Sequence, residues 1–125
     1  MTPITIMLSW PPAELSPNAR TSRHASAAVA KAYKLEAYYA ALQALGPNNW
    51  KFGERHRLTR VKIRYTFAPP DARVRDDDNH ISRMKWARDG IAKALGVDDR
   101  IFSTQPVEWA RPVRGGSVTV EIRTA

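Results

Sequence analysis

An alternating stretch in the middle of the chain is the clearest indicator of the fold: Thr59-Arg60-Val61-Lys62-Ile63-Arg64-Tyr65-Thr66-Phe67. From Val61 onward the odd-numbered side chains are apolar or aromatic and the even-numbered ones are polar. Successive side chains of a strand point to opposite faces, so this period of two predicts a strand with one buried face. Pro69-Pro70 would end it.

The sequence on either side predicts two helices and three further strands. We expect the strands at residues 4–8, 105–112 and 117–123, and the helices at residues 22–45 and 79–95, the second with Asp78 as its N-cap. This order predicts an α+β fold in which a small mixed β-sheet packs against two helices. The length of 125 residues predicts one domain, residues 1–125.

The chain is strongly basic and contains no cysteine. It has 20 Lys and Arg against 12 Asp and Glu, a net charge of +8, which suits a polyanionic partner. The absence of cysteine excludes disulfides and thiolate metal sites and fits a cytoplasmic location. No apolar run approaches the ~20 residues that span a bilayer, so we expect no membrane partner.

Seven of the twelve acidic residues lie between Asp71 and Asp99, and three are consecutive in Arg75-Asp76-Asp77-Asp78-Asn79. A simple nucleic-acid binder gains nothing from pointing carboxylates at phosphates. A nuclease does, because the carboxylates hold a divalent cation that contacts the phosphate. The pattern therefore predicts metal-dependent phosphodiester chemistry.

Asp76 and Asp78 are the first candidate metal ligands. In an extended segment, residues two apart point to the same side, and two such carboxylates repel each other unless a cation lies between them. Oxygen ligands favour Mg²⁺, with Mn²⁺ as a substitute, over zinc. The alternative is structural: Asp78 caps the helix and its neighbours interact with the helix dipole.

Asp98-Asp99 is a second acidic pair just past this helix, for which the alternative is a polar turn. Lys85, two turns after Asp78, is a candidate to contact the scissile phosphate, or else a solvated lysine. A straight helix over residues 79–95 would be about 25 Å long and would separate Asp78 from Asp99. The two can share a metal only if the helix breaks, if the following chain doubles back, or if a second subunit supplies one of them.

Basic and aromatic residues elsewhere are candidates for DNA contacts. The basic candidates are Arg20, Lys51, Arg55, Arg57, Arg73, Arg75, Arg83 and Arg88. Trp50 lies in a basic loop and is a candidate for stacking on a base. His80 adjoins the acidic run, and we interpret it as a surface histidine.

In three stretches the chain resembles the RusA family of Holliday junction resolvases, in particular its phage and prophage members. These stretches are Leu8-Ser9-Trp10-Pro11-Pro12 with the segment that follows to Arg20, the Arg-Asp-x-Asp-Asn run at 75–79, and Lys85 to Asp99. The resemblance implies that Asp76, Asp78 and Asp99 are catalytic, metal-binding aspartates. It matches the family's catalytic lysine to Lys85, whereas the shortest family spacing falls on Ser82.

The resemblance also implies a homodimer that cuts four-way DNA junctions with Mg²⁺ by paired, symmetric nicks, in DNA recombination and repair. Two alternatives stay open at this point. One is a non-catalytic DNA- or RNA-binding protein, in which the acids are caps and solvated turns. The other is a nuclease acting on different branched DNA, such as flaps or forks.

Overall fold

The computed structural model describes residues 3–20, 22–47 and 57–124 and has the predicted α+β architecture. Its strands are β1 (Ile4–Ser9), β2 (Val61–Ala68), β3 (Phe102–Thr104), β4 (Glu108–Trp109) and β5 (Ser117–Thr124). Its α-helices are α1 (Arg23–Leu45), α3 (Asp77–Arg83) and α4 (Lys85–Leu95), with 3₁₀ turns η1 (Ala13–Leu15) and η2 (Asp99–Ile101).

The strands form one mixed sheet with the order β1-β5-β2-β3, in which β4 also pairs with β2. The β1–β5 and β5–β2 pairs are antiparallel, while β3 and β4 run parallel to β2. The alternation predicted from the sequence is confirmed in β2, where Val61, Ile63, Tyr65 and Phe67 are all buried. One face of the sheet therefore supplies the core.

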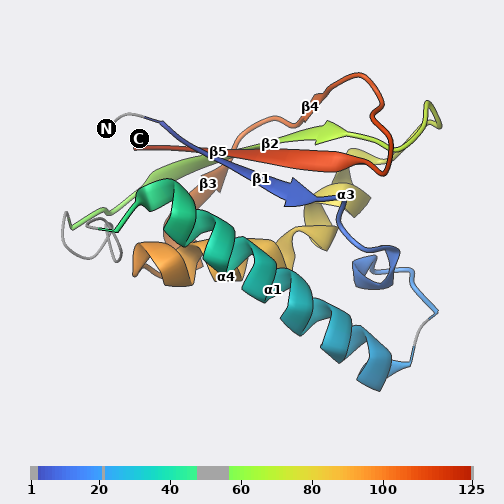
Figure 1. The fold of residues 1–125 in the computed structure, drawn as a ribbon, viewed down its shortest axis with the longest axis horizontal. Helices are drawn as coiled ribbons and strands as arrows, with labels where there is room; N and C mark the ends of the chain where they lie inside the picture. The colour runs from blue at the N-terminus through green and yellow to red at the C-terminus, as the bar shows by residue number, and fades with distance from the viewer. Residues whose placement is uncertain (1–2, 21, 48–56, 125) are drawn as a thin grey trace.

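Helices α1 and α4 lie next to each other on that apolar face (Figure 1). The buried side of α1 consists of alanines together with Tyr33 and Leu45, and small side chains let two helices approach closely. The Tyr33 hydroxyl donates a hydrogen bond of 2.8 Å to the carbonyl of Ser9, which ties α1 to the end of β1. Among the described helices, none is long and apolar enough to cross a bilayer.

The single helix predicted over residues 79–95 is wrong in two respects. It is two helices, α3 and α4, separated at Met84, whose amide donates to the carbonyl of Ile81. The first helix also begins earlier than predicted, because Asp76 is extended and its side chain accepts a hydrogen bond from the Asp78 amide. Asp76, not Asp78, is therefore the N-cap.

The strand predicted over residues 105–112 is also wrong. Within that range only Glu108–Trp109 (β4) forms a strand, while β3 ends at Thr104, before Gln105-Pro106. Proline has no amide hydrogen to donate, so Pro106 interrupts the ladder. The Gln105 amide donates to the carbonyl of Ile63 at 2.8 Å and keeps the segment alongside β2.

Candidate active site

The acidic run at residues 76–78 lies at the start of α3. Asp76 Oδ1 accepts from the Asp78 amide at 2.9 Å, and Asp77 Oδ1 accepts from Trp109 Nε1 at 2.6 Å. Only Asp76 is extended, so the alternation that would place Asp76 and Asp78 on one side does not apply to this pair. Both carboxylates are exposed near the helix N-terminus, where negative charge is favourable.

Asp99 lies against Asp89, a residue that the sequence did not single out as a ligand. Asp89 is half-buried on α4, and Asp99 begins η2 after the chain has turned back. Burial raises the pKa of the Asp89 carboxyl, and the hydrogen bond to Asp99 and the negative charge of Asp99 raise it further. We call Asp89 and Asp99 the carboxylate pair.

Arg88 positions the Asp99 side of the carboxylate pair. Its Nη2 donates to the carbonyls of Asp99 at 3.3 Å and Phe102 at 2.8 Å, and its Nη1 donates to Thr104 Oγ1 at 2.6 Å. These bonds join α4 to η2 and β3. Arg88 was predicted to contact a DNA phosphate. Its guanidinium already donates these hydrogen bonds, so a phosphate would have to replace them.

Two lysines flank the carboxylate pair. The positive charges of Lys34, from α1, and Lys85, at the start of α4, both oppose the rise in the pKa of Asp89. Lys85 Nζ also lies 5.0 Å from the centroid of the Trp86 ring. The spacing of four between Lys85 and Asp89 was the available sequence signal, since residues four apart share a helix face. Nothing in the sequence indicated Lys34.

The three aspartates predicted as metal ligands do not form one cluster. Within residues 3–20, 22–47 and 57–124, no group of three or more His, Cys, Asp or Glu side chains is arranged to hold a metal ion. The carboxylate pair nevertheless has the right chemistry, because Mg²⁺ commonly binds one or two carboxylates and completes its shell with water and substrate phosphate. A cation would also relieve the repulsion between the two charges.

Arg75 and Arg83, two predicted DNA contacts, are engaged within the protein. Arg75 donates to the Asp71 carboxylate at 2.7 Å, and its guanidinium lies 5.5 Å from the centroid of the Trp10 ring. Arg83 Nε donates to Asn79 Oδ1 at 3.1 Å, and its Nη1 to the carbonyl of Pro11 at 3.4 Å. These bonds hold the segments that flank α3.

Other predicted DNA contacts are exposed. Arg20 and Arg57 are exposed, and Arg73 forms an exposed ion pair of 3.1 Å with Asp71, a kind of pair that is easily exchanged for another partner. Lys51, Arg55 and Trp50 lie outside the described residues.

The interpretation of His80 as a surface residue is wrong, because its side chain is 4% exposed. It packs among the rings of Trp10, Phe67 and Trp109. Its Nδ1 lies 2.9 Å from the carbonyl oxygen of Asp76. Burial lowers the pKa of His80, so the ring is neutral and Nδ1–H donates. His80 therefore anchors the first turn of α3 to the sheet.

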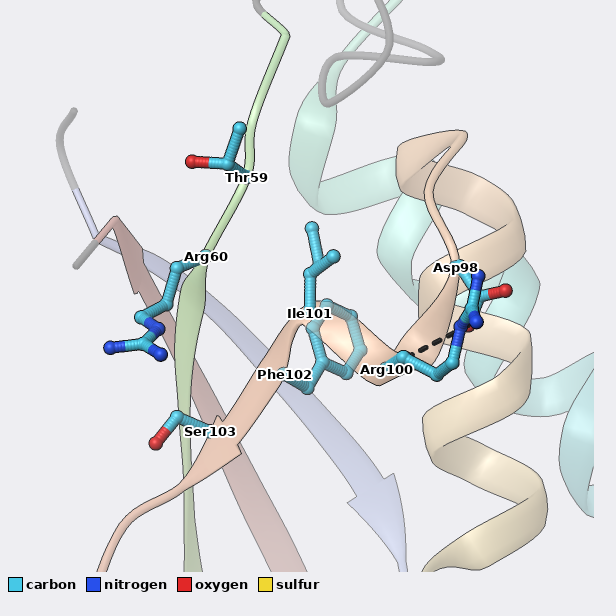
Figure 2. A pocket seen from close by; sticks show the side chains of 7 residues that line it. All are labelled: Thr59, Arg60, Asp98, Arg100, Ile101, Phe102 and Ser103. Atoms are coloured by element: carbon cyan, nitrogen blue, oxygen red, sulfur yellow. Dashed lines mark hydrogen bonds and ion pairs between the residues drawn. The ribbon is translucent and has the colours of Figure 1, made fainter.

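A shallow pocket of about 590 Å³ adjoins η2. Asp98 and Arg100, the chain neighbours of Asp99, line one side, and Arg60 and Ser103 line the other. Figure 2 shows Arg100 turned toward Asp98, to which its Nε is paired at 3.2 Å, while Arg60 points away from that pair. Arg60 is exposed, so among the residues that the structure describes the pocket has one unpaired basic side chain opposite the pair of Asp98 and Arg100.

No protein-family model matches the chain. A protein of Xylella fastidiosa (strain Temecula1), described as an uncharacterized protein, is 36% identical over 121 residues, which cover 94% of this chain and 74% of that protein. The two proteins belong to one family. The description of this relative names no activity, so the functional argument rests on the residues and contacts described above.

Proposed function

We propose that the protein is a divalent-cation-dependent endodeoxyribonuclease that cuts branched DNA, with the four-way junction as its substrate. The observation that carries this proposal is the carboxylate pair, flanked by Lys34 and Lys85 in a chain of net charge +8. Acidic groups with basic groups near enough to act on them electrostatically suit an enzyme that holds a cation against a phosphodiester. The resemblance to the RusA family supports the same chemistry.

Asp89 and Asp99 would hold the cation, which is Mg²⁺ with Mn²⁺ as a substitute. When bound, it supplies charge neutralisation at the phosphate and a water molecule of lowered pKa. Lys85 binds and orients the scissile phosphate and stabilises negative charge that develops on it. Arg88 acts as a positioning residue, because it fixes the backbone of Asp99.

The proposed enzyme is a homodimer, because resolving a four-way junction needs two symmetric nicks and a two-fold pair of sites supplies both. Asp76 and Asp78 are exposed, and we propose that they complete the site of the partner subunit. The exposed Arg20, Arg57, Arg60 and Arg73 would contact DNA backbones. Because DNA is the substrate, the proposal assigns the protein to the bacterial cytoplasm.

The direct test is a nicking assay on a synthetic mobile four-way junction with Mg²⁺, beside EDTA and two matched variants. Asp99→Asn should lower the nicking rate by at least about 100-fold, because it removes a metal ligand. Glu108→Gln is the control, because Glu108 is an exposed acid of β4 that pairs with Arg64 of β2 and takes no part in the carboxylate pair.

Paired symmetric nicks that disappear in EDTA and in Asp99→Asn, but persist in Glu108→Gln, would support the proposal. Tight junction binding without cutting under Mg²⁺ or Mn²⁺ would overturn the enzymatic part and leave a branched-DNA binder. Faster cutting of flaps or forks than of the four-way junction would change the substrate but keep the chemistry.

A further inference from the structure

A cleft of about 630 Å³ opens between η1, the first half of α1 and Trp86 of α4. Its apolar lining comes from Leu15, Ala19, Ala27 and Ala30 together with the ring of Trp86. This volume lies in the range typical of small-molecule sites. The cleft is therefore large enough for a flat ring system to lie within it.

The cleft is also strongly cationic. Arg23, Lys31 and Lys34 line it against the single acid Glu14. Unlike those of Arg75, Arg83 and Arg88, the side chains of Arg23 and Lys31 form no hydrogen bond or ion pair among the residues that the structure describes. An apolar interior with an aromatic wall and a cationic rim suits a ligand that combines a flat ring with negative charge. A nucleotide has this combination.

The cleft lies next to residues of the candidate active site. Lys34 lines the cleft and also acts electrostatically on Asp89. Trp86 directly follows Lys85, and the ammonium group of Lys85 lies 5.0 Å from the centroid of the indole ring. A nucleotide whose base entered the cleft would thus bring its phosphate toward Lys85 and the carboxylate pair.

We propose that this cleft receives an unpaired base of the DNA substrate, which packs against Trp86 while Arg23 and Lys31 hold the adjoining phosphates. The inference rests on the proposed function and adds to it a reason for the choice of branched DNA. Extracting a base from a continuous duplex costs unstacking and unpairing energy; that cost is lower at a branch point, where stacking is interrupted, and lowest where a base is already unpaired. The cleft therefore selects DNA that offers such a base.

The test measures binding in EDTA, where no cutting occurs, by fluorescence anisotropy of a labelled DNA. Three short duplexes are compared: fully paired, carrying one unpaired thymidine, and carrying an abasic nucleotide at that position. The unpaired thymidine should bind about tenfold more tightly than the abasic nucleotide, the gain expected from one stacked base. Trp86→Ala should abolish this ratio and Trp86→Phe should keep most of it. Tyr39→Ala, at an exposed tyrosine of α1 outside the cleft, should leave it unchanged.

Equal binding of the thymidine and abasic duplexes by the native protein would overturn the inference without any variant. The inference is also overturned if Trp86→Ala keeps the affinity ratio between the two duplexes. A Trp86→Ala protein that keeps this ratio but sediments as a monomer where the native protein is a dimer would make the cleft a protein interface. If Mg²⁺-dependent nicking of a junction is observed with a ratio of one, the inference fails and the proposed function stands. If the protein binds neither these duplexes nor a four-way junction, both fail.

Discussion

At the scale of single residues, the contact between Asp89 and Asp99 sets the properties of the candidate site. Burial and the neighbouring Asp99 raise the pKa of Asp89. Ionising Asp89 therefore costs more free energy in the folded protein than in the unfolded chain, which solvates the carboxylate freely. As pH falls through the raised pKa, the folded state takes up a proton first and this cost disappears.

Asp89→Asn should therefore stabilise the metal-free protein at neutral pH. We expect its thermal midpoint in EDTA at pH 7.5 to exceed that of the native protein by roughly 2–4 °C. The difference should shrink as pH falls from the raised pKa of Asp89 toward 3.8. Thermal unfolding followed by circular dichroism over this pH range measures both. A midpoint lowered at pH 7.5 would contradict the prediction.

Asp98→Asn is the control with the opposite sign. In the native protein, the hydrogen bond from the Arg100 amide lowers the pKa of Asp98. Ionised Asp98 therefore stabilises the fold, and this contribution is lost as pH falls through the lowered pKa. Asp98→Asn should not raise the midpoint at pH 7.5.

Mg²⁺ should raise the thermal midpoint of the native protein and not that of Asp89→Asn, because a ligand stabilises only the state that binds it.

At the scale of elements, the close crossing of α1 and α4 positions the lysines around the carboxylate pair. A Cβ placed on Gly90 would overlap the carbonyl oxygen of Lys34. No side chain fits there without moving the helices apart. Gly90→Ala should lower the free energy of unfolding by about 1–3 kcal/mol, despite the helix propensity of alanine, which favours it by up to about 1 kcal/mol.

Urea unfolding measures the effect of Gly90→Ala. Ala44→Leu, which enlarges an exposed alanine of α1, is the matched control and should change stability by less than about 0.5 kcal/mol. Equal stabilities of Gly90→Ala and the native protein would mean that the crossing is looser than described.

The periodic elements could be predicted from sequence and the irregular ones could not. The alternation of β2 and the alanine-rich period of α1 are local patterns, so both elements were found within two residues of their ends. The break at Met84 could not be predicted, because no glycine or proline marks it in the sequence. Met84 and His80 are both buried, so the break accompanies tertiary packing that a local pattern does not show. In the candidate site, Asp99 was named from the sequence and its partner Asp89 was not. The two carboxylates meet because the chain turns back after α4, and Arg88 holds that turn through its bond to the Asp99 carbonyl.

At the scale of the whole molecule, a single protomer keeps apart the two groups of acids that the sequence analysis assigned to one metal site. Asp76 and Asp78 lie at the start of α3, and Asp99 lies beside Asp89 after α4. A two-fold dimer offers a simple way to bring the groups together, because each protomer can supply α3 to the carboxylate pair of the other.

This arrangement predicts that two inactive variants restore activity when mixed. In a dimer of one Asp76→Asn chain and one Asp99→Asn chain, one shared site carries both substitutions and the other carries neither. After free exchange of subunits about half of the dimers are mixed, so the nicking rate should reach about a quarter of the native rate. Mixing Asp89→Asn with Asp99→Asn is the control: both residues belong to one pair, every site stays damaged, and no activity should return. If the first mixture stays inactive while differently labelled subunits are seen to exchange, each site is built within one protomer.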